Sequence, residues 1–346
     1  ITTRLVGSEM CIRDSIYIVK KAFIAGGTGF LGRVALEKFV SRGVPVAAAS
    51  RSGGNACGVS VDNLDFFAES GECLTAYFKE KKFDVFIYAL GPDDRVMPPA
   101  PAAPFFREKL VVQCKKILSA AVAAGAERLV VLGSYFAYFD KLCKGRLSES
   151  HPYIRARREQ EDAALSSGVA AVVLELPYIF GVPENGAPIW RESFLAHFDR
   201  YPAVFMTKGR TAATDATGVA EAVFAAAHCG SGCVPVGGEN ISYIELVKKM
   251  LRFAKDGRRV LKIPAWLGAL GARSVAKEYK KQGKEPGLDP VKLMTQIQNK
   301  DFSLDPAATE RALQYERFGF SAVRDTEAEL KKTMRACYPE RFGAEK

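Results

Sequence analysis

Few residues of this sequence are suited to binding a metal ion: it has three histidines, and its eight cysteines are scattered. A structural zinc ion needs four such ligands, and CxxC pairs usually supply two of them. No CxxC pair occurs, and Cys229 and Cys233 are too isolated to complete a set of four. We therefore expect no metal site, and free thiols as in a reducing cytoplasm.

Long hydrophobic runs are also absent. No stretch approaches the ~18 uninterrupted apolar residues of a membrane-spanning helix. The N-terminal residues lack the basic, apolar and small-residue regions of a secretory signal. Hydrophobic residues nevertheless make up 48% of the chain, which is enough for a sizeable core. The composition predicts a globular, enzyme-sized protein without a membrane partner.

Residues 1–15 show neither helical nor strand periodicity. Within them, the stretch RLVGSEMCIRDS (residues 4–15) looks like the read-through translation of a sequencing-library adapter. Such a scar is set aside before the fold is considered; a natural disordered N-terminus is the alternative. In either case we expect this segment not to pack on the fold.

The net charge of +10 arises in one region, because residues 248–300 contain 14 Lys and Arg against 4 Asp and Glu. One interpretation is attraction of an anionic substrate or a polyanion. The other, which we favour, is a solvated basic face, as in KEYKKQGKE (residues 277–285). Few aromatic residues are interleaved there, which argues against a stacking surface for nucleic acid.

Short apolar runs alternate with helical stretches over the first 240 residues. A strand at residues 23–25 precedes the glycine turn AGGTGFLG, and helical spacing follows it until Gly43. Further apolar runs are VPVAAASR, FDVFIYALG, ERLVVLGSY, VAAVVLELPYIFG and CVPVGG. Near-continuous apolar strands separated by helices are typical of a parallel sheet covered on both faces. The sequence thus predicts an α/β fold with a Rossmann-type, doubly wound parallel sheet.

The pattern changes beyond about residue 182, where PENGAPIWRESF is rich in turn residues, and after residue 240 it becomes mainly helical. Prolines interrupt this helical pattern at Pro264, Pro286, Pro290 and Pro306. We predict a Rossmann domain of residues 16–181 plus 205–234. Residues 182–204 plus 235–345 are predicted to form a smaller, mostly helical substrate-binding domain over the C-terminal edge of the sheet.

The glycine turn is the strongest functional signal. Gly26, Gly29 and Gly32 have GxxGxxG spacing between a strand and a helix. The first glycine makes the tight turn, the second lets the backbone approach a pyrophosphate, and the third lets the helix pack closely on the strand. The N-terminus of that helix faces the phosphates. This arrangement predicts dinucleotide binding.

The end of the second strand indicates which dinucleotide. Proteins that bind NAD often have an acidic residue here for the ribose 2′-hydroxyl, whereas this chain has Ser50, Arg51 and Ser52. A guanidinium and two hydroxyls suit a 2′-phosphate. We therefore expect NADP as the cofactor, with NAD as the second choice. Asp62, near the end of the third strand, is a candidate contact of the adenine.

These features resemble the extended short-chain dehydrogenase/reductase family, the NAD-dependent epimerase/dehydratase group, from about residue 20 to residue 338. The resemblance rests on GGTGFLG, on YALG, on LVVLGSYFAYF, on the tyrosine stretch HPYIRARREQED and on LPYIFG. It implies that the cofactor contacts Gly26, Thr28, Gly29, Phe30, Leu31, Gly32, Ala89, Leu90, Gly91 and Pro177. It also implies a catalytic serine at Ser134 and a catalytic tyrosine at Tyr153.

The chain departs from the family at three positions. Arg157 stands where the family motif has lysine, Leu110 where it has asparagine, and Glu175 where it has arginine. These departures indicate a divergent branch. Arg157 is still expected to supply a positive charge near Tyr153 and to bond the ribose hydroxyls of the cofactor.

Spacing alone does not identify the tyrosine. Tyr17 with Lys21 and Tyr77 with Lys81 match YxxxK, but both pairs precede the fourth strand. Tyr153 begins a helix after the serine, and a residue four positions on lies on the same helical face. The alternative is a surface tyrosine beside a solvated basic helix face.

The expected mechanism is hydride transfer at a carbonyl or alcohol carbon. Tyr153 exchanges the oxygen-bound proton, and Ser134 hydrogen-bonds the same oxygen. We expect a nearby cation to lower the phenol pKa from its ordinary value of ~10 by roughly 1–3 units. Arginine supplies that charge but does not relay a proton.

The main hypothesis is thus an NADP-preferring oxidoreductase or epimerase that acts on a small molecule, of which an anionic one is an option. One rival is a catalytically inactive, cofactor-binding regulator or structural subunit. The other is an RNA-associated relative of the family, suggested by the positive charge. A homodimer is left open.

Overall fold

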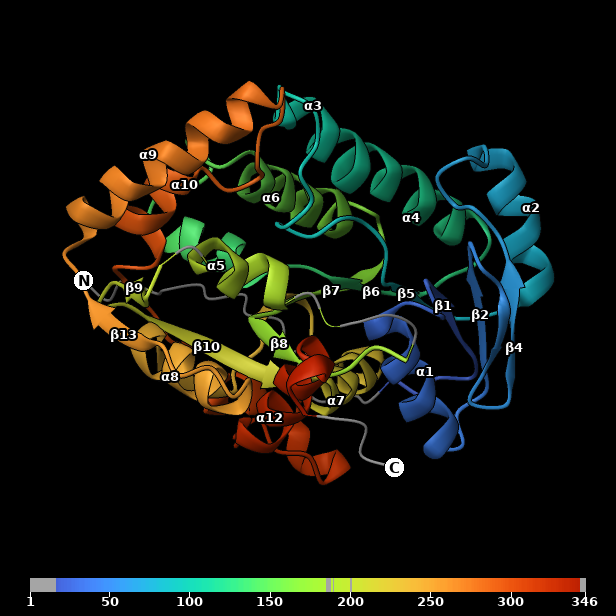
Figure 1. The fold of residues 1–346 in the computed structure, drawn as a ribbon. Helices are drawn as coiled ribbons and strands as arrows, with labels where there is room; N and C mark the ends of the chain where they lie inside the picture. Colours follow the sequence, from blue (N-terminus) through green and yellow to red (C-terminus); the bar gives the residue numbers. More distant parts are fainter. Residues whose placement is uncertain (1–16, 185–187, 189, 200, 343–346) are drawn as a thin grey trace, which may run out of the picture.

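The computed structural model describes residues 17–184, 188, 190–199 and 201–342 of the chain. The adapter-like segment of residues 1–15 lies outside the described residues, so the expectation that it does not pack stays a prediction. A large sheet with helices on both faces lies beside a smaller part built from short strands and helices (Figure 1).

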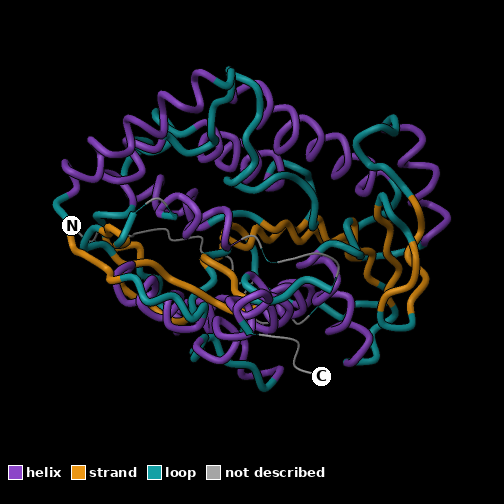
Figure 2. The backbone as a smooth tube through the Cα atoms, viewed as in Figure 1, coloured by secondary structure: helices purple, strands orange, loops and turns teal. Residues whose placement is uncertain are grey.

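The large sheet has eight strands (Figure 2, orange). Their spatial order is β11 (Gly232–Pro235), β7 (Ala170–Glu175), β6 (Arg128–Leu132), β5 (Val85–Tyr88), β1 (Ala22–Ala25), β2 (Val46–Ser50), β4 (Val59–Asn63) and β3 (Gly54–Ala56). Neighbouring strands are parallel, except that β3 is antiparallel to β4. The strand order reverses between β1 and β5, and doubly wound sheets bind ligands at the carboxyl ends of such strands. The predicted Rossmann-type fold is confirmed.

Helices cover both faces of this sheet because successive side chains of a strand point to opposite faces. Ile24 packs into one core with helices α1 (Phe30–Ser41) and α7 (Ala216–His228). Its neighbour Phe23 packs into a second core with α2 (Gly71–Lys81) and α4 (Gln113–Ala123). Figure 1 shows α2, α4 and α6 (Pro152–Leu165) on one side of the strands and α1 and α7 on the other. Both faces are therefore dry, as a parallel sheet requires.

The remaining elements of the Rossmann part follow β5 and β6. They are α3 (Ala102–Arg107), a π-helical turn η1 (Glu108–Val112), α5 (Tyr135–Leu142) and α6 (Pro152–Leu165). The predicted helix that Gly43 ends is α1, and Gly43 has a positive φ of 69° after its last turn. The N-terminus of α7 is capped by the Asp215 carboxylate, which accepts a hydrogen bond from the Gly218 N–H.

The smaller part contains two small sheets. Strands β12 (Glu239–Ser242), β10 (Arg210–Asp215) and β14 (Asp301–Phe302) form one, and β8 (Tyr178–Phe180) also pairs with β10. Strands β13 (Arg259–Lys262) and β9 (Ala203–Met206) form the other. The helical elements are η2 (Arg191–Leu195), η3 (Ala196–Phe198), α8 (Tyr243–Phe253), α9 (Ala265–Lys281), α10 (Pro290–Lys292), η4 (Leu293–Ile297), α11 (Pro306–Ala312), η5 (Tyr315–Phe318), α12 (Glu327–Cys337) and η6 (Pro339–Arg341).

Three of the four predicted proline breaks coincide with helix starts: Pro264 precedes α9, and Pro290 and Pro306 begin α10 and α11. Proline has no N–H to donate, so it fits the first turn of a helix. Strands β8 and β10, which lie within the predicted Rossmann domain, pair with each other in the smaller part's sheet. The division into two domains stays a prediction.

Candidate functional site

The glycine turn lies between β1 and α1, against the end of β5. Gly26 has φ +95°, and a Cβ there would be 2.5 Å from the Ala89 carbonyl oxygen. A Cβ on Gly32 would overlap the Gly26 carbonyl oxygen. The turn therefore requires glycine at both positions, and Phe30 and Leu31 begin the helix directly after it. This close packing leaves the N-terminus of α1 at the carboxyl end of the sheet, where a pyrophosphate fits.

Residues 89–91 border this turn. The Ala89 N–H donates to the Ala25 carbonyl oxygen at 3.0 Å, and Leu90 packs near Gly26. Gly91 has φ +107°, and a Cβ there would be 2.8 Å from a methyl carbon of Leu110. Leu110, which stands where the family has asparagine, is buried in η1 and holds this loop by packing. The structure thus places Ala89, Leu90 and Gly91 beside Gly26.

Three hydroxyls gather at the end of β2, next to the glycine turn. Thr28 Oγ1 donates to Ser50 Oγ at 2.7 Å and lies 2.9 Å from Ser52 Oγ. Arg51 stands between the two serines and is exposed. Within the part of the chain that the structure describes, its guanidinium has no hydrogen bond or ion pair. A free cation beside three hydroxyls suits a phosphate group.

Asp62 is already engaged. Tyr77 Oη donates to its carboxylate at 2.6 Å, and Lys81 forms an ion pair with it. These bonds lower the Asp62 pKa, with Lys81 as the main cause. Tyr77 and Lys81 match the spacing of the tyrosine motif, but in the structure both side chains bind the Asp62 carboxylate. The role of Asp62 beside the adenine stays a prediction.

The second spacing match, Tyr17 with Lys21, has a structural role too. Tyr17 Oη donates to Asp84 at 3.0 Å, and the Lys21 ammonium donates to the Lys81 carbonyl oxygen at 2.8 Å. Both contacts lie at the amino end of the sheet strands, opposite to the glycine turn. Tyr17 and Lys21 therefore lie away from the end of the sheet where the cofactor is expected.

Tyr153 and Arg157 meet on one face of α6. Arg157 Nε donates to the Tyr153 phenol oxygen at 2.9 Å, and both side chains are buried. The guanidinium also donates to the carbonyl oxygens of Leu132 at 3.1 Å and Pro92 at 3.3 Å, and to Gln160 Oε1 at 2.7 Å. Leu132 ends β6, and Pro92 follows β5. Arg157 thus ties the tyrosine to the carboxyl ends of two central strands.

The pKa of Tyr153 corrects one expectation. Burial raises it, and the positive charge of Arg157 offsets only part of this effect. The phenol pKa therefore lies above its ordinary value and not below it, as we had expected. Because Arg157 donates to the phenol oxygen, the phenol's own hydrogen stays available to a substrate oxygen.

Ser134 and Pro177 lie at the ends of β6 and β7. Ser134 is buried and caps α5, with its hydroxyl accepting from the Phe136 N–H at 3.4 Å. Pro177 is buried between β7 and β8. The Tyr135 N–H donates to the Leu176 carbonyl oxygen at 3.0 Å, which ties the two strand ends together. Both residues therefore belong to the same edge of the sheet as Tyr153.

The departure at Glu175 belongs to a buried ionic cluster. Ligand atoms of Glu161, Glu175 and Cys233 lie within 4.8 Å of one another, and no other such group occurs among the described residues. The Lys141 ammonium bonds Glu175 at 2.7 Å and Glu161 at 3.1 Å. Burial and the Glu161 charge raise the Glu175 pKa. An internal cation thus already neutralises this cluster, and the absence of a metal stays a prediction.

Our sequence-based prediction missed the charged loop that follows β5. Arg95 bonds Asp93 there, which lowers the Asp93 pKa against the effect of burial. Burial raises the pKa of Asp94 instead. The charge of Asp94 in turn acts on four phenols, those of Tyr135, Tyr153, Tyr178 and Tyr243. The sequence does contain a sign of this loop, because three charged residues stand in GPDDR (residues 91–95), shortly after a buried strand.

A segment of the smaller part packs over Tyr153. The Tyr153 N–H donates to the Gly287 carbonyl oxygen at 3.0 Å, and a Cβ on Gly287 would be 2.8 Å from Tyr153 Cβ. The Asp289 N–H donates to His151 Nδ1 at 2.9 Å. Burial lowers the His151 pKa to about 4, so this ring is neutral. Residues 287–289 therefore fix the start of α6 from outside the Rossmann sheet.

Comparison with known proteins agrees with this geometry. Residues 26–191 match a family model described as NAD(P)H-binding. No curated protein sequence matches the chain. Among solved structures, the protein gox2253 has a TM-score of 0.69 at 17% identity, over 94% of this chain and all of the other.

Two further structures are enzymes of known cofactor or substrate. The Bordetella bronchiseptica enzyme WbmH, in complex with NAD+, has a TM-score of 0.63 at 16% identity, over 94% of this chain and 99% of its own. The UDP-glucose 4-epimerase of Thermotoga maritima, with UDP-glucose, has a TM-score of 0.62 at 12% identity, over 93% and 99%.

Residues 26–191 are therefore an NAD(P)H-binding domain of the Rossmann type. Beyond that domain, the chain shares its fold with these solved structures. The family model confirms the predicted binding of a nicotinamide dinucleotide, and the solved structures agree in fold with the resemblance that the sequence motifs indicated.

Proposed function

We propose that this protein is an NADP-preferring oxidoreductase or epimerase in which Tyr153 is the general acid and base. The observation that carries the proposal is the bond from Arg157 to the Tyr153 phenol oxygen, formed at the same edge of the sheet as the glycine turn. A buried, protonated phenol with a free hydrogen is suited to protonate a substrate oxygen.

The residues present fit a dinucleotide. The turn at Gly26 and Gly32 has no room for a side chain, and it leaves backbone N–H groups at the start of α1 to bind a pyrophosphate. When bound, the nicotinamide supplies or accepts the hydride. Arg51, with Ser50 and Ser52, would hold a 2′-phosphate, which supports NADP over NAD.

The protein's own residues then carry the proton. In the direction of reduction, Tyr153 gives its hydrogen to the substrate oxygen, and Ser134 hydrogen-bonds that oxygen. Arg157 stabilises the phenolate that remains, because its charge lowers the phenol pKa. Arg157 holds its own proton and is bound to two carbonyl oxygens, so the phenol must be reprotonated by another route than the family's lysine.

A regulator that binds cofactor without turnover is the second candidate. The four hydrogen bonds of Arg157 support this candidate, because they would also hold the strand ends together in a protein without catalytic activity. An RNA-associated function has no support from the site itself.

The experiment follows NADPH consumption by the purified chain with a panel of aldehydes and ketones, and conversion of nucleotide sugars to their epimers, because an epimerase returns its hydride to the sugar and consumes no cofactor. Turnover with any member, faster than without enzyme, supports the proposal. Tight NADPH binding without turnover across the panel favours the regulator. Absence of NADPH and NADH binding would contradict both.

A further inference from the structure

An exposed apolar patch marks the start of helix α9. Four large hydrophobic side chains are exposed within ten residues: Leu261 (44%), Trp266 (64%), Leu267 (43%) and Leu270 (45%). The chain has two tryptophans, and the other one, Trp190, is buried. Single exposed apolar residues are ordinary, whereas several within ten residues of the chain indicate a surface that binds a partner.

The exposed apolar side chains do not take part in packing α9 onto the rest of the molecule. Helix α9 packs on α10 and η4 through small residues: Ala272 is buried, and a Cβ on Gly268 would be 3.1 Å from Met294 Sδ. Residues on the opposite face of the helix point outward. The larger apolar side chains at the start of α9 are therefore exposed and are not part of the core.

Basic residues continue the outward face of α9. Trp266, Leu270, Arg273, Lys277 and Lys280 are spaced by four, three, four and three residues, which places them in one row along a helix. All five are exposed. The face is thus apolar at its N-terminal end and cationic over the rest of its length.

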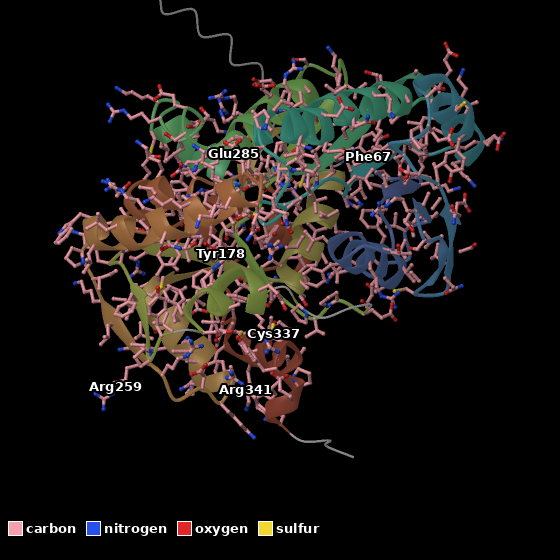
Figure 3. All side chains as sticks on the ribbon, turned by 45° about the horizontal axis from the view of Figure 1, so that its top comes forward. Phe67, Tyr178, Arg259, Glu285, Cys337 and Arg341 are labelled. Atoms are coloured by element: carbon pink, nitrogen blue, oxygen red, sulfur yellow. The ribbon has the colours of Figure 1, made fainter. Side chains whose placement is uncertain are left out.

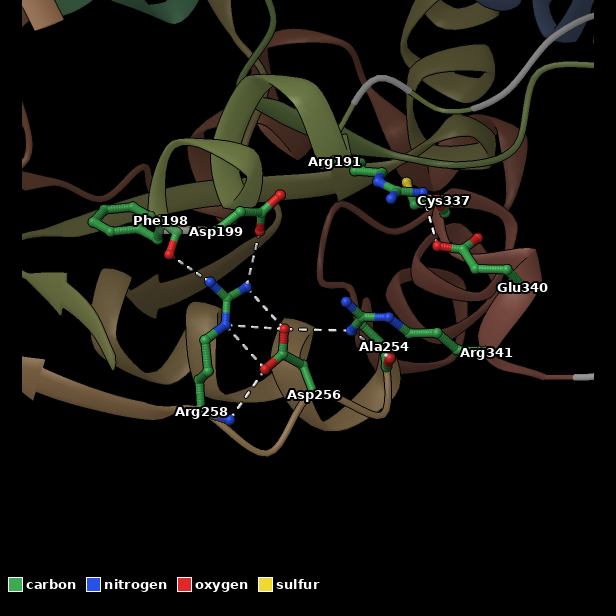
Figure 4. Close-up of polar contacts among 9 residues, drawn as sticks. All are labelled: Arg191, Phe198, Asp199, Ala254, Asp256, Arg258, Cys337, Glu340 and Arg341. Atoms are coloured by element: carbon green, nitrogen blue, oxygen red, sulfur yellow. Dashed lines mark hydrogen bonds and ion pairs between the residues drawn. The ribbon is translucent and has the colours of Figure 1, made fainter. Parts of the chain in front are cut away.

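The charges of this face are unpaired. Residues 259–284 contain seven Lys and Arg and one Glu. None of these seven cations forms an ion pair within the described ranges. Arg258 differs, because Asp256 and Asp199 bind it in the network that Figure 4 shows. Its neighbour Arg259 points outward at the edge of the molecule (Figure 3).

We infer that the start of α9 docks on the surface of an anionic lipid bilayer. Tryptophan and leucine suit the boundary between headgroups and acyl chains, and lysine and arginine beside them attract anionic headgroups. No helix in the described part of the chain is long and apolar enough to cross a membrane. The proposed contact is therefore at the bilayer surface. In predicting no membrane partner from the sequence, we considered only membrane-spanning segments.

Charge selects the bilayer among the partners of an apolar patch. A second copy of the chain would bring two cationic faces together, which is repulsive. A single-stranded nucleic acid would need several aromatic side chains for stacking, and the row on α9 contains only Trp266.

The test uses the full chain and two sets of vesicles, one of phosphatidylcholine and one with added phosphatidylglycerol. We expect sedimentation with the anionic vesicles only, weakened by salt, together with a blue shift of the Trp266 emission. Lys277→Glu should weaken binding about thirtyfold, since it removes one attractive charge and adds a repulsive one. Trp266→Ser should abolish the emission shift.

Matched controls are Lys331→Glu on α12 and Val323→Ser, both exposed positions away from α9. They should bind like the wild type. If a variant at Trp266 unfolds, quenching of wild-type emission by brominated lipid still reports insertion. The inference is overturned if the chain does not bind anionic vesicles, or if Lys277→Glu binds them as well as the wild type does. It is also overturned if the chain is retained on RNA but not on vesicles, or if it self-associates through Trp266 and does not bind vesicles.

Discussion

Replacing Arg157 by methionine tests whether this guanidinium organises the site. Methionine keeps an unbranched side chain of similar length but donates no hydrogen bond. Two buried acceptors, the Leu132 carbonyl oxygen and Gln160 Oε1, then lose their donor. Each unsatisfied buried acceptor costs ~1–3 kcal/mol, so we expect the free energy of unfolding to fall by about 2–6 kcal/mol.

The assay is urea unfolding of Arg157→Met and of a control, Arg155→Met, on the same helix. Arg155 is exposed and donates to the carbonyl oxygens of Ser148 and Glu149. Its loss should cost under about 1 kcal/mol, because water replaces those bonds. Arg157→Lys should fall between the two, since a compact ammonium keeps the charge but not the forked geometry.

The two variants also separate charge from structure at the phenol. Arg157→Met should raise the Tyr153 pKa further, so the basic limb of any rate profile shifts to higher pH; Arg157→Lys should leave it near the wild-type position. If Arg157→Met unfolds with the same free energy as Arg155→Met, the guanidinium does not tie the strand ends together and the reasoning is refuted.

Two further predictions concern the cofactor and the start of α6. Arg51→Asp should weaken NADPH binding at least tenfold more than NADH binding, measured by calorimetry, because a charge-assisted bond is replaced by repulsion; equal wild-type dissociation constants for the two cofactors would contradict this. His151 is neutral in the fold because burial lowers its pKa to about 4, so stability should be complete above the unfolded value of 6.5 and fall by up to ~3 kcal/mol as pH drops toward 4. His151→Asn, whose amide oxygen replaces the Nδ1 acceptor of the Asp289 N–H, should flatten this dependence; an unchanged pH profile would show that His151 is not its source.

The glycine turn and the sheet could be predicted because their signals are local. Gly26 and Gly32 fix the turn through the shape of a few neighbouring residues, and each buried strand shows its own apolar run. The bonding of Arg157 could not be predicted in the same way. Its partners Pro92 and Leu132 lie 65 and 25 residues away, and carbonyl oxygens leave no trace in the residue type.

The tyrosine motif shows the same limit. Tyr77 and Lys81 match the YxxxK motif fully, whereas Tyr153 is followed by Arg157 in place of the lysine. Tyr77 and Lys81 nevertheless bind Asp62 and have a structural role. Tyr153 lies at this edge of the sheet, as its position after β6 predicted, but position did not show that burial raises its pKa. Nor did it show that Gly287, from the smaller part, covers it. Burial and coverage depend on distant packing, which a local pattern does not encode.

The most direct test of the central claim is Tyr153→Phe. This change keeps the ring that packs against Phe106 and removes only the hydroxyl. Once a substrate is found, NADPH oxidation by Tyr153→Phe should be slower by about 10²–10⁴-fold, with NADPH affinity unchanged. Turnover equal to the wild type would show that Tyr153 is not the acid.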